Sequence, residues 1–389
     1  MKRPVYLDHA ASTPVDPRVA AAMAQCLTLE GEFGNPASSS HDYGEAANRL
    51  VESARIQVAA SMGASPDDVV WTSGATEANN LAIFGVAEYY REYGRHIVTA
   101  RTEHKAVLDP CRELERRGWR VTYLAPDPAG VLRLDQLAAA LQADTVLVSI
   151  MHVNNEIGVI QDIEGIGALC ATHGSARLHV DAAQSAGKCA VDFRRFGVDL
   201  MSLSAHKVYG PKGVGALLVR GRGSPVHLAP LQFGGGQERG LRAGTVATHQ
   251  VVGMGLAFAL AQSAPGSEAE RIAMLRERLW QGLSSLGGAW RNGHAEKSVP
   301  HILNVSFEGV EGESLLAAVR RDIAVSTGSA CTSTLREPSY VLRALGRDDV
   351  LSESSLRFGL GRFTGERDID TALSVVARAV SRLRCISGA

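Results

Sequence analysis

Short β-branched runs alternate with longer helical stretches between about residues 69 and 220. Such alternation predicts an α/β protein with a mostly parallel sheet covered by helices. Ligands of open α/β sheets bind at the carboxyl ends of the strands. The seven runs expected to form strands are Val69–Thr72, His96–Thr99, Arg120–Leu124, Thr145–Met151, Leu178–Asp181, Leu200–Ser204 and Ala216–Arg220.

A second domain is expected after the glycine-rich segment at 234–240, with Ala264-Pro265-Gly266 as its boundary. Its predicted elements are a helix at 268–286, a strand at 302–307 and a helix at 369–384. In the last helix Ile369, Leu373, Val376 and Val380 share one face, as in a helix packed on its own domain. We expect a large domain at 16–264, and a small domain formed by 1–15 and 265–389.

Composition indicates a globular protein that does not bind polyanions. Of the 389 residues 45% are hydrophobic and 21% charged, and 40 Lys plus Arg against 41 Asp plus Glu give a net charge of −1. No nucleic-acid partner is therefore expected. Asp8, His9 and Pro14 lie where a signal peptide needs an apolar run, and the longest apolar stretch, 251–261, is far short of the roughly 20 residues that span a bilayer. No membrane association is expected.

The six cysteines lie far apart and form no metal-binding spacing. No resident metal site is expected. Scattered thiols in a large chain suit a reducing cytoplasm, where most are buried and one could be reactive. The cysteines are Cys26, Cys111, Cys170, Cys189, Cys331 and Cys385.

Lys207 follows a predicted strand, beside His206, in a turn leading to Gly210-Pro211-Lys212-Gly213. This is a suitable place for a lysine that forms a Schiff base. A lone lysine in a loop is more often simply solvated. The neighbouring strand ends decide between the two interpretations.

Two further strand ends carry polar residues. The segment 72–77 (TSGATE) connects a strand to a helix, where backbone amides and hydroxyls could hold a phosphate. The competing interpretation is a plain helix start, with Thr76 as the N-cap and Asn79 and Asn80 exposed. Asp181 ends another strand, where a carboxylate could hold a pyridinium nitrogen protonated or simply cap a turn.

A phosphate cradle, a carboxylate for a ring nitrogen and an amine for a Schiff base are what pyridoxal 5′-phosphate (PLP) requires of a protein. Lys207 follows Asp181 by about one strand and one crossover, so both belong at the same edge of the sheet. Together the three elements favour a PLP enzyme.

Five longer segments carry a specific resemblance: FGNPAS at 33–38, TEHKAV at 102–107, HVNNEIG at 152–158, HVDAAQ at 179–184 and TGSACTS at 327–333. With them, nearly the whole chain from Tyr6-Leu7-Asp8 to the last helix resembles the cysteine desulfurases of the IscS/NifS group. These are class V aminotransferase-like proteins of PLP fold type I, with a seven-stranded large domain and a smaller α+β domain. Ala205 and Thr327 replace a glycine and a serine common in the group, and both are small.

The resemblance implies a role for each residue at the cofactor. Lys207 carries PLP, Asp181 pairs with the ring nitrogen, and His104 stacks on the ring and shuttles protons. Thr245 reaches the phosphate of a partner subunit, which implies a homodimer. The remaining implied contacts are Ala75, Thr76, Ser204 and His206 to the phosphate, and Asn155 and Gln184 to the ring oxygen.

The resemblance also implies the substrate and the reaction. Arg357 and Asn35, with Asn155 nearby, hold the carboxylate of L-cysteine, for which a guanidinium is well shaped. Without the resemblance Arg357 would count as half of a surface ion pair. Cys331, in a polar loop, attacks the substrate sulfur, becomes a persulfide and releases L-alanine. Selenocysteine could serve as substrate as well.

Several alternatives stay open. An aminotransferase or lyase of the same fold would make Cys331 incidental, whereas a non-catalytic scaffold should lack Lys207 or Asp181, and both are present. The sulfur acceptor could be an iron-sulfur scaffold protein, with Cys331 as a transient cluster ligand, a carrier for tRNA thiolation or a specialised pathway protein. Members that serve iron-sulfur scaffolds usually have a longer C-terminal tail than this chain, which ends at Ala389.

Overall fold

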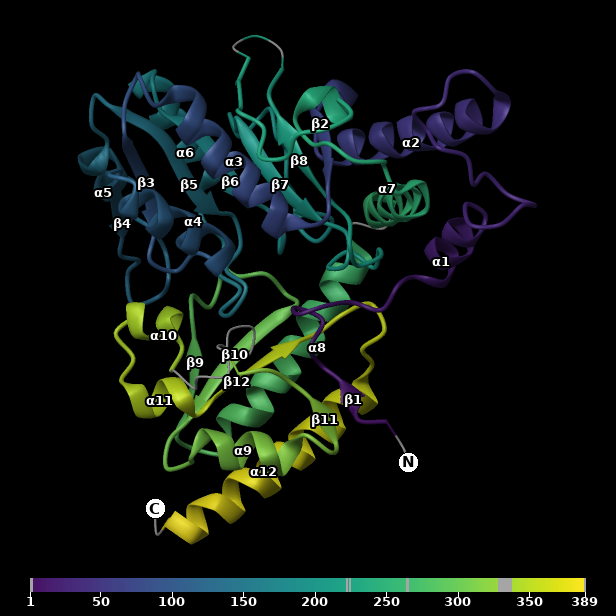
Figure 1. Cartoon of the computed structure of the whole chain (residues 1–389). Helices are drawn as coiled ribbons and strands as arrows, with labels where there is room; N and C mark the ends of the chain where they lie inside the picture. The colour runs from purple at the N-terminus through teal and green to yellow at the C-terminus, as the bar shows by residue number, and fades with distance from the viewer. Residues whose placement is uncertain (1–2, 222, 224, 264–265, 328–337, 388–389) are drawn as a thin grey trace.

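A computed structural model describes residues 3–221, 223, 225–263, 266–327 and 338–387. Its centre is a seven-stranded sheet in the order β2-β8-β7-β6-β5-β3-β4 (Figure 1). The five strands from β7 to β4 are parallel, and β8 is antiparallel to both of its neighbours. The strands are β2 (Val69–Thr72), β3 (His96–Ala100), β4 (Arg120–Leu124), β5 (Thr145–Met151), β6 (Arg177–Asp181), β7 (Leu200–Ser204) and β8 (Gly215–Val219).

The predicted fold class is confirmed, and all seven predicted strands are present. Four of them, β2, β4, β5 and β7, have the predicted bounds, and the other three differ by one residue at one or both ends. Apart from β4, every residue in these strands is buried or nearly so. Near-continuous apolar runs are typical of strands covered on both faces.

Helices cover both faces of this sheet. Successive strand residues point to opposite sides, so each strand contributes to two separate cores. Val70 packs with α3 (Ala75–Tyr90) and α4 (Lys105–Arg116). Trp71 belongs to the opposite core, with Val58 and Phe258. That core includes α2 (Asp42–Ser61), α6 (Ile163–His173) and α7 (Thr248–Gln262), which contains the longest apolar stretch.

A second core lies below the large sheet in Figure 1, around smaller sheets. One is antiparallel, with β10 (Ile302–Phe307) between β9 (Ala289–Asn292) and β12 (Ser355–Gly359). The other pairs β1 (Val5–Tyr6) with β11 (Ile323–Ala324) in parallel. The other elements are α1 (Pro17–Ala24), α5 (Leu134–Ala140), α8 (Ser267–Ser284), α9 (Gly312–Val319), α10 (Tyr340–Ala344), α11 (Asp349–Glu353), α12 (Glu366–Ser387) and the 3₁₀ turns Pro66–Asp68 and Glu238–Gly240.

The second core contains residues from both ends of the chain. Leu7 is fully buried there together with Leu279 of α8 and Phe358 of β12. The predicted face of α12 also packs into it, with Ile369, Val376 and Val380 buried and Leu373 partly buried. We therefore propose the domain limits 16–264 and 1–15 with 265–389. Residues 264 and 265 themselves lie outside the described residues.

No helix in the described part of the chain is both long enough and apolar enough to cross a membrane.

Candidate active site

A cavity of about 500 Å³ opens at the carboxyl ends of β6 and β7, beside the starts of α3 and α4. Its lining includes most of the side chains that the sequence indicated, and they come from five separate segments. The predicted residues found there are Ala75, Thr76, His104, Asn155, Asp181, Gln184, Ser204, His206 and Lys207.

Asp181 and Lys207 reach this cavity because β6 and β7 are parallel neighbours. Asp181 ends β6 opposite Ser202 of β7, and Lys207 lies three residues beyond the end of β7. Asp181 is 5% exposed. A carboxylate and an amine therefore face one enclosed space from adjacent strand ends.

Asn79 holds the Asp181 carboxylate and was missed in the sequence. Its Nδ2 donates to Asp181 Oδ2 at 2.7 Å, and the Ala183 N–H donates to Oδ1 at 2.9 Å. Asn79 is fully buried, so its interpretation as an exposed helix residue is wrong. It lies four residues after Ala75, on the same face of α3, and this spacing was the available signal.

His104 is the N-cap of α4, and its Nδ1 accepts the Ala106 N–H at 3.1 Å. Burial lowers the pKa of His104; the charge of Asp181 raises this pKa and that of Lys207 lowers it. A neutral imidazole that accepts at Nδ1 carries its proton at Nε2. His104 can therefore present an N–H at Nε2 while its ring stays fixed by the helix start.

His206 is also held neutral. Burial, and after it the charge of Lys207, lower the pKa of His206 to about 4. The Thr13 hydroxyl donates to the His206 carbonyl at 2.8 Å, and Ser12 Oγ lies 3.3 Å from Nδ1. The N-terminal segment therefore fixes the turn that carries Lys207.

The start of α3 can accept an anion. Its N-cap is Gly74 without a side-chain capping bond, so the proposed Thr76 cap is wrong. The first N–H groups of a helix have no partner within the helix and attract negative charge. Nearby, Ser204 Oγ is buried and finds no hydrogen-bond partner among the described residues. A phosphate would satisfy both.

Two amide oxygens on the cavity wall also lack hydrogen-bond partners among the residues that the structure describes. Asn155 Oδ1 and Gln184 Oε1 are buried and have none within the described ranges, whereas Gln184 Nε2 donates to the Ala10 carbonyl at 2.8 Å. Buried polar atoms are costly to leave unpaired, so they indicate a bound group. The amine, the carboxylate, the amides and the helix start together fit PLP.

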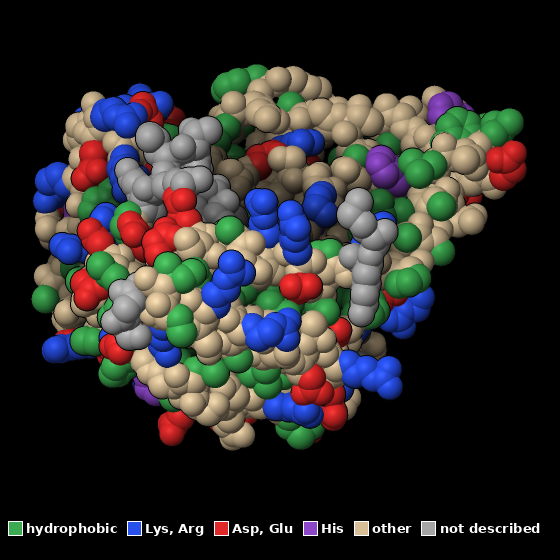
Figure 2. Space-filling view, turned by 90° about the horizontal axis from the view of Figure 1, so that it is seen from below, with side chains coloured by type: hydrophobic (Ala, Val, Ile, Leu, Met, Phe, Trp, Pro, Cys, Tyr) green, Lys and Arg blue, Asp and Glu red, His purple; other side chains and the backbone are tan. Residues whose placement is uncertain are grey.

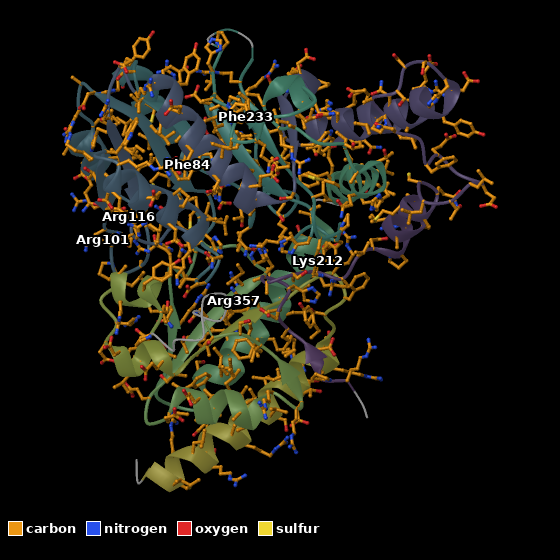
Figure 3. The ribbon with its side chains drawn as sticks, viewed as in Figure 1. Phe84, Arg101, Arg116, Lys212, Phe233 and Arg357 are labelled. Atoms are coloured by element: carbon orange, nitrogen blue, oxygen red, sulfur yellow. The ribbon has the colours of Figure 1, made fainter. Side chains whose placement is uncertain are left out.

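Arg357 lies behind this wall, on β12. Its side chain is 2% exposed, so its interpretation as half of a surface ion pair is wrong. Its Nη1 donates to the Asn155 carbonyl and its Nη2 to Asp8 Oδ1, both at 2.9 Å. Figure 3 shows Arg357 and Lys212 in the zone between the large and the small sheets. Arg357 thus touches a residue of the cavity from the other domain.

Two predicted residues, Asn35 and Thr245, are not brought to the cavity of the same chain, and the place of a third is not described. Asn35 is exposed on the connection between α1 and α2, where its Oδ1 accepts the Ala37 N–H at 3.0 Å. Thr245 lines a separate hollow beside the glycine-rich segment 234–236. Cys331 lies outside the described residues. The roles of these three stay predictions.

Comparison with known proteins places the chain in a family. The profile of the family described as Aminotransferase class-V matches residues 5–372. The chain belongs to the class-V aminotransferase family. Proteins named cysteine desulfurase IscS match all of this chain and 95% of their own length, with 58% identity in Aeromonas hydrophila and 56% in Pectobacterium atrosepticum. The predicted family and the PLP cofactor of its cysteine desulfurase members are thereby confirmed.

Solved structures agree with this class-V membership. A NifS-like protein has a TM-score of 0.90 at 37% identity, covering 98% of this chain and all of its own. DndA from Streptomyces lividans has a TM-score of 0.77 at 42% identity, covering 91% of this chain and 99% of its own. A structure titled SspA in complex with cysteine has a TM-score of 0.81 at 37% identity and covers 94% of this chain.

Proposed function

We propose that this protein is a PLP-dependent cysteine desulfurase, which takes sulfur from L-cysteine, forms a persulfide on Cys331 and releases L-alanine. The observation that carries the proposal is the cavity in which Lys207, Asp181 and His104 meet, in a chain 56–58% identical to cysteine desulfurases over its full length. The step balances because the S–S bond of the persulfide forms as the Cβ–S bond of the substrate breaks, and the electron pair of that bond stays on carbon.

PLP, when bound, supplies an aldehyde that condenses with amines and a ring that draws electrons from the substrate Cα. Lys207 would hold the cofactor through its Nζ, and the same amine, when free, would be the base that removes the Cα proton. Asp181 would pair with the ring nitrogen and keep it protonated. Because Asn79 and the Ala183 N–H both donate to Asp181, its carboxylate keeps one orientation.

His104 and Arg357 act on the substrate itself. The Nε2 proton of neutral His104 is available for transfer, since Nδ1 is occupied by the Ala106 N–H. Arg357 receives the substrate carboxylate, and its contact with the Asn155 carbonyl ties it to the cavity wall. Cys331 thiolate takes the substrate sulfur, and protons delivered to Cβ and to Cα of the remaining three-carbon unit give L-alanine.

The test is incubation of the PLP-loaded enzyme with L-cysteine, with separate assays for L-alanine, sulfide and protein-bound persulfide. We expect alanine in equal amount to the sulfur released, and none from Lys207→Ala. Cys331→Ser should form no persulfide at that position. A keto acid in place of alanine would indicate an aminotransferase and contradict the proposal.

A homodimer is part of the proposal. Exposed apolar side chains cluster at the connection between α1 and α2, which projects from the body of the molecule (Figures 1 and 2): Leu27, Leu29, Phe33 and Tyr43 are between 46% and 75% exposed. Thr245 lies outside its own cavity, next to Phe233, which is 85% exposed. Both surfaces fit contact with a second copy.

Subunit mixing tests the dimer and the role of Thr245 together. Lys207→Ala and Thr245→Glu subunits, each inactive alone, should regain activity when mixed, because the intact Lys207 site then receives Thr245 from its partner. Thr245→Glu mixed with itself is the control. Absence of rescue, with mixed dimers confirmed by mass, would place Thr245 in its own site and contradict the proposal.

We propose that the protein that accepts the persulfide sulfur is an iron-sulfur scaffold protein. We also propose that the enzyme acts in the cytoplasm. The support is the match to proteins named IscS. The face in Figure 2 carries basic and acidic side chains side by side, so no single charge pattern selects a partner. Persulfide transfer from the loaded enzyme to purified candidate acceptors, measured by intact mass, tests this choice, and transfer to no scaffold would exclude it.

A further inference from the structure

Asp8 is a carboxylate beside Arg357 that the proposed reaction does not use. Its Oδ1 accepts from Arg357 Nη2 at 2.9 Å, and the Asp8 side chain is 19% exposed. The backbone of Asp8 also pairs with Gly359, two residues beyond Arg357 on β12. The ion pair is thus fixed by main-chain as well as side-chain contacts.

Ser326 holds the second oxygen of the same carboxylate. Its hydroxyl donates to Asp8 Oδ2 at 2.8 Å. The backbone of Ser326 is paired with Arg357, whose N–H donates to the Ser326 carbonyl at 2.7 Å. Asp8, Ser326 and Arg357 therefore form one joined unit, in which the carboxylate has little freedom to turn away.

The guanidinium has five N–H groups, and the two contacts described here use only one on each Nη nitrogen. Nη1 is bonded to the Asn155 carbonyl and Nη2 to Asp8, while the buried Nε has no partner in the described part of the chain. A carboxylate normally binds a guanidinium through two N–H groups. A ligand carboxylate at Arg357 must therefore approach a guanidinium whose charge Asp8 already compensates.

We propose that Asp8 is the resident counter-ion of Arg357 and sets the affinity of the enzyme for the carboxylate of its substrate. An unpaired buried charge is costly, so Asp8 stabilises the empty site. When the ligand binds, two carboxylates share one guanidinium and repel each other, which limits affinity. The proposal rests on the proposed role of Arg357 in carboxylate binding.

Asp8→Asn tests this, because asparagine keeps the size and an acceptor oxygen but removes the charge. Calorimetric titration of the PLP-loaded enzyme with L-alanine should show about tenfold tighter binding than in the wild type. The KM for L-cysteine should fall by a similar factor without a rise in kcat, whereas the KM for cysteamine, which lacks a carboxylate, should not change. Asp322→Asn, an exposed residue beside β1, is the control for loss of one negative charge.

Ser326→Ala is the second variant, since it keeps both charges and removes only the hydrogen bond to Asp8 Oδ2. Because the Asp8 carboxylate can then turn away from Arg357, this variant should bind L-alanine about twofold more tightly. It also tests the proposal if Asp8→Asn does not fold. Unchanged or weaker alanine binding in the variant that folds would overturn the proposal. Failure of the desulfurase assignment would appear separately, as a wild-type enzyme that makes no alanine from L-cysteine.

Discussion

The two sides of the cavity are built in different ways. On the large-sheet side, Asp181 and Lys207 lie at or just beyond the ends of adjacent parallel strands. On the small-sheet side, Arg357 is held by Asn155 and Asp8, which lie 202 and 349 residues away in sequence. One pair of neighbouring strands therefore places Asp181 and Lys207, whereas the proposed carboxylate site exists only after both domains have packed.

The largest effect should come from Lys207. Lys207→Ala removes the amine that holds the cofactor and takes the Cα proton, so we expect kcat to fall by about 10³-fold or more. Lys212→Ala, also on the cavity wall, is the matched loss of a lysine and should keep the cofactor covalently attached. Visible absorbance of the bound cofactor and alanine formation measure the difference. Retained covalent cofactor in Lys207→Ala would contradict the assignment.

A buried histidine on the large-sheet side should make the free energy of unfolding depend on pH. His179 is fully buried in β6 between Ser149 and Ser202, and burial lowers its pKa to about 4. Between pH about 6.5 and 4 the unfolded chain takes up a proton at this position that the folded chain does not. The free energy of unfolding therefore decreases as the pH is lowered through this range.

We expect His179→Asn to lower that slope by up to about 1.4 kcal/mol per pH unit. Urea unfolding of both proteins at several pH values measures it. His294→Asn, at a partly buried loop position, is the control for loss of a histidine. Equal slopes for wild type and His179→Asn would show that His179 takes up a proton as readily in the folded as in the unfolded chain, which would contradict the lowered pKa.

Asn79 provides a smaller test of the same side. Asn79→Leu removes the donor to Asp181 Oδ2, and we expect kcat to fall about tenfold with a loss of about 1–3 kcal/mol of stability. Asn80→Ala is the neighbouring control, because the Asn80 side chain donates to the Thr76 carbonyl of its own helix. A fall in stability without a change in kcat or in the pH dependence of the cofactor absorbance would assign Asn79 a purely structural role.

Ser204 should give the smallest effect. Its Oγ has no partner within the described residues, so Ser204→Ala should leave the stability of the cofactor-free protein unchanged or slightly higher. If the hydroxyl binds the phosphate, the Kd for PLP should rise by about five- to tenfold. Equilibrium dialysis measures this, with wild-type protein as reference. An unchanged Kd would remove Ser204 from the phosphate site.

Much of the large-sheet side could be predicted because its signals are local. Apolar runs such as Thr145–Met151 are long enough to identify a strand, and a polar residue at a strand end indicates a site. Asn79 was missed because an asparagine near a helix start usually caps it or faces solvent. Only the packing of α3 over β6 shows that its amide meets Asp181.

The small-sheet side was predicted only in part: the strand at 302–307 and the helices that correspond to α8 and α12 are confirmed, whereas its short strands were not predicted. β1 and β11 have two residues each, too few for a periodic pattern, and they exist only as partners of one another. Arginine is rarely buried, so the pattern of β12 gave no sign that Arg357 lies inside. The charge of Asp8, brought from the other end of the chain, is what makes that burial tolerable.

The most direct test of the account is the mass of the intact protein after one turnover with L-cysteine. The account predicts a gain of one sulfur atom, mapped to Cys331 and absent in Cys331→Ser, with one equivalent of L-alanine released. Alanine without any sulfur on the protein, or sulfur on Cys331 from an enzyme that lacks Lys207, would contradict it.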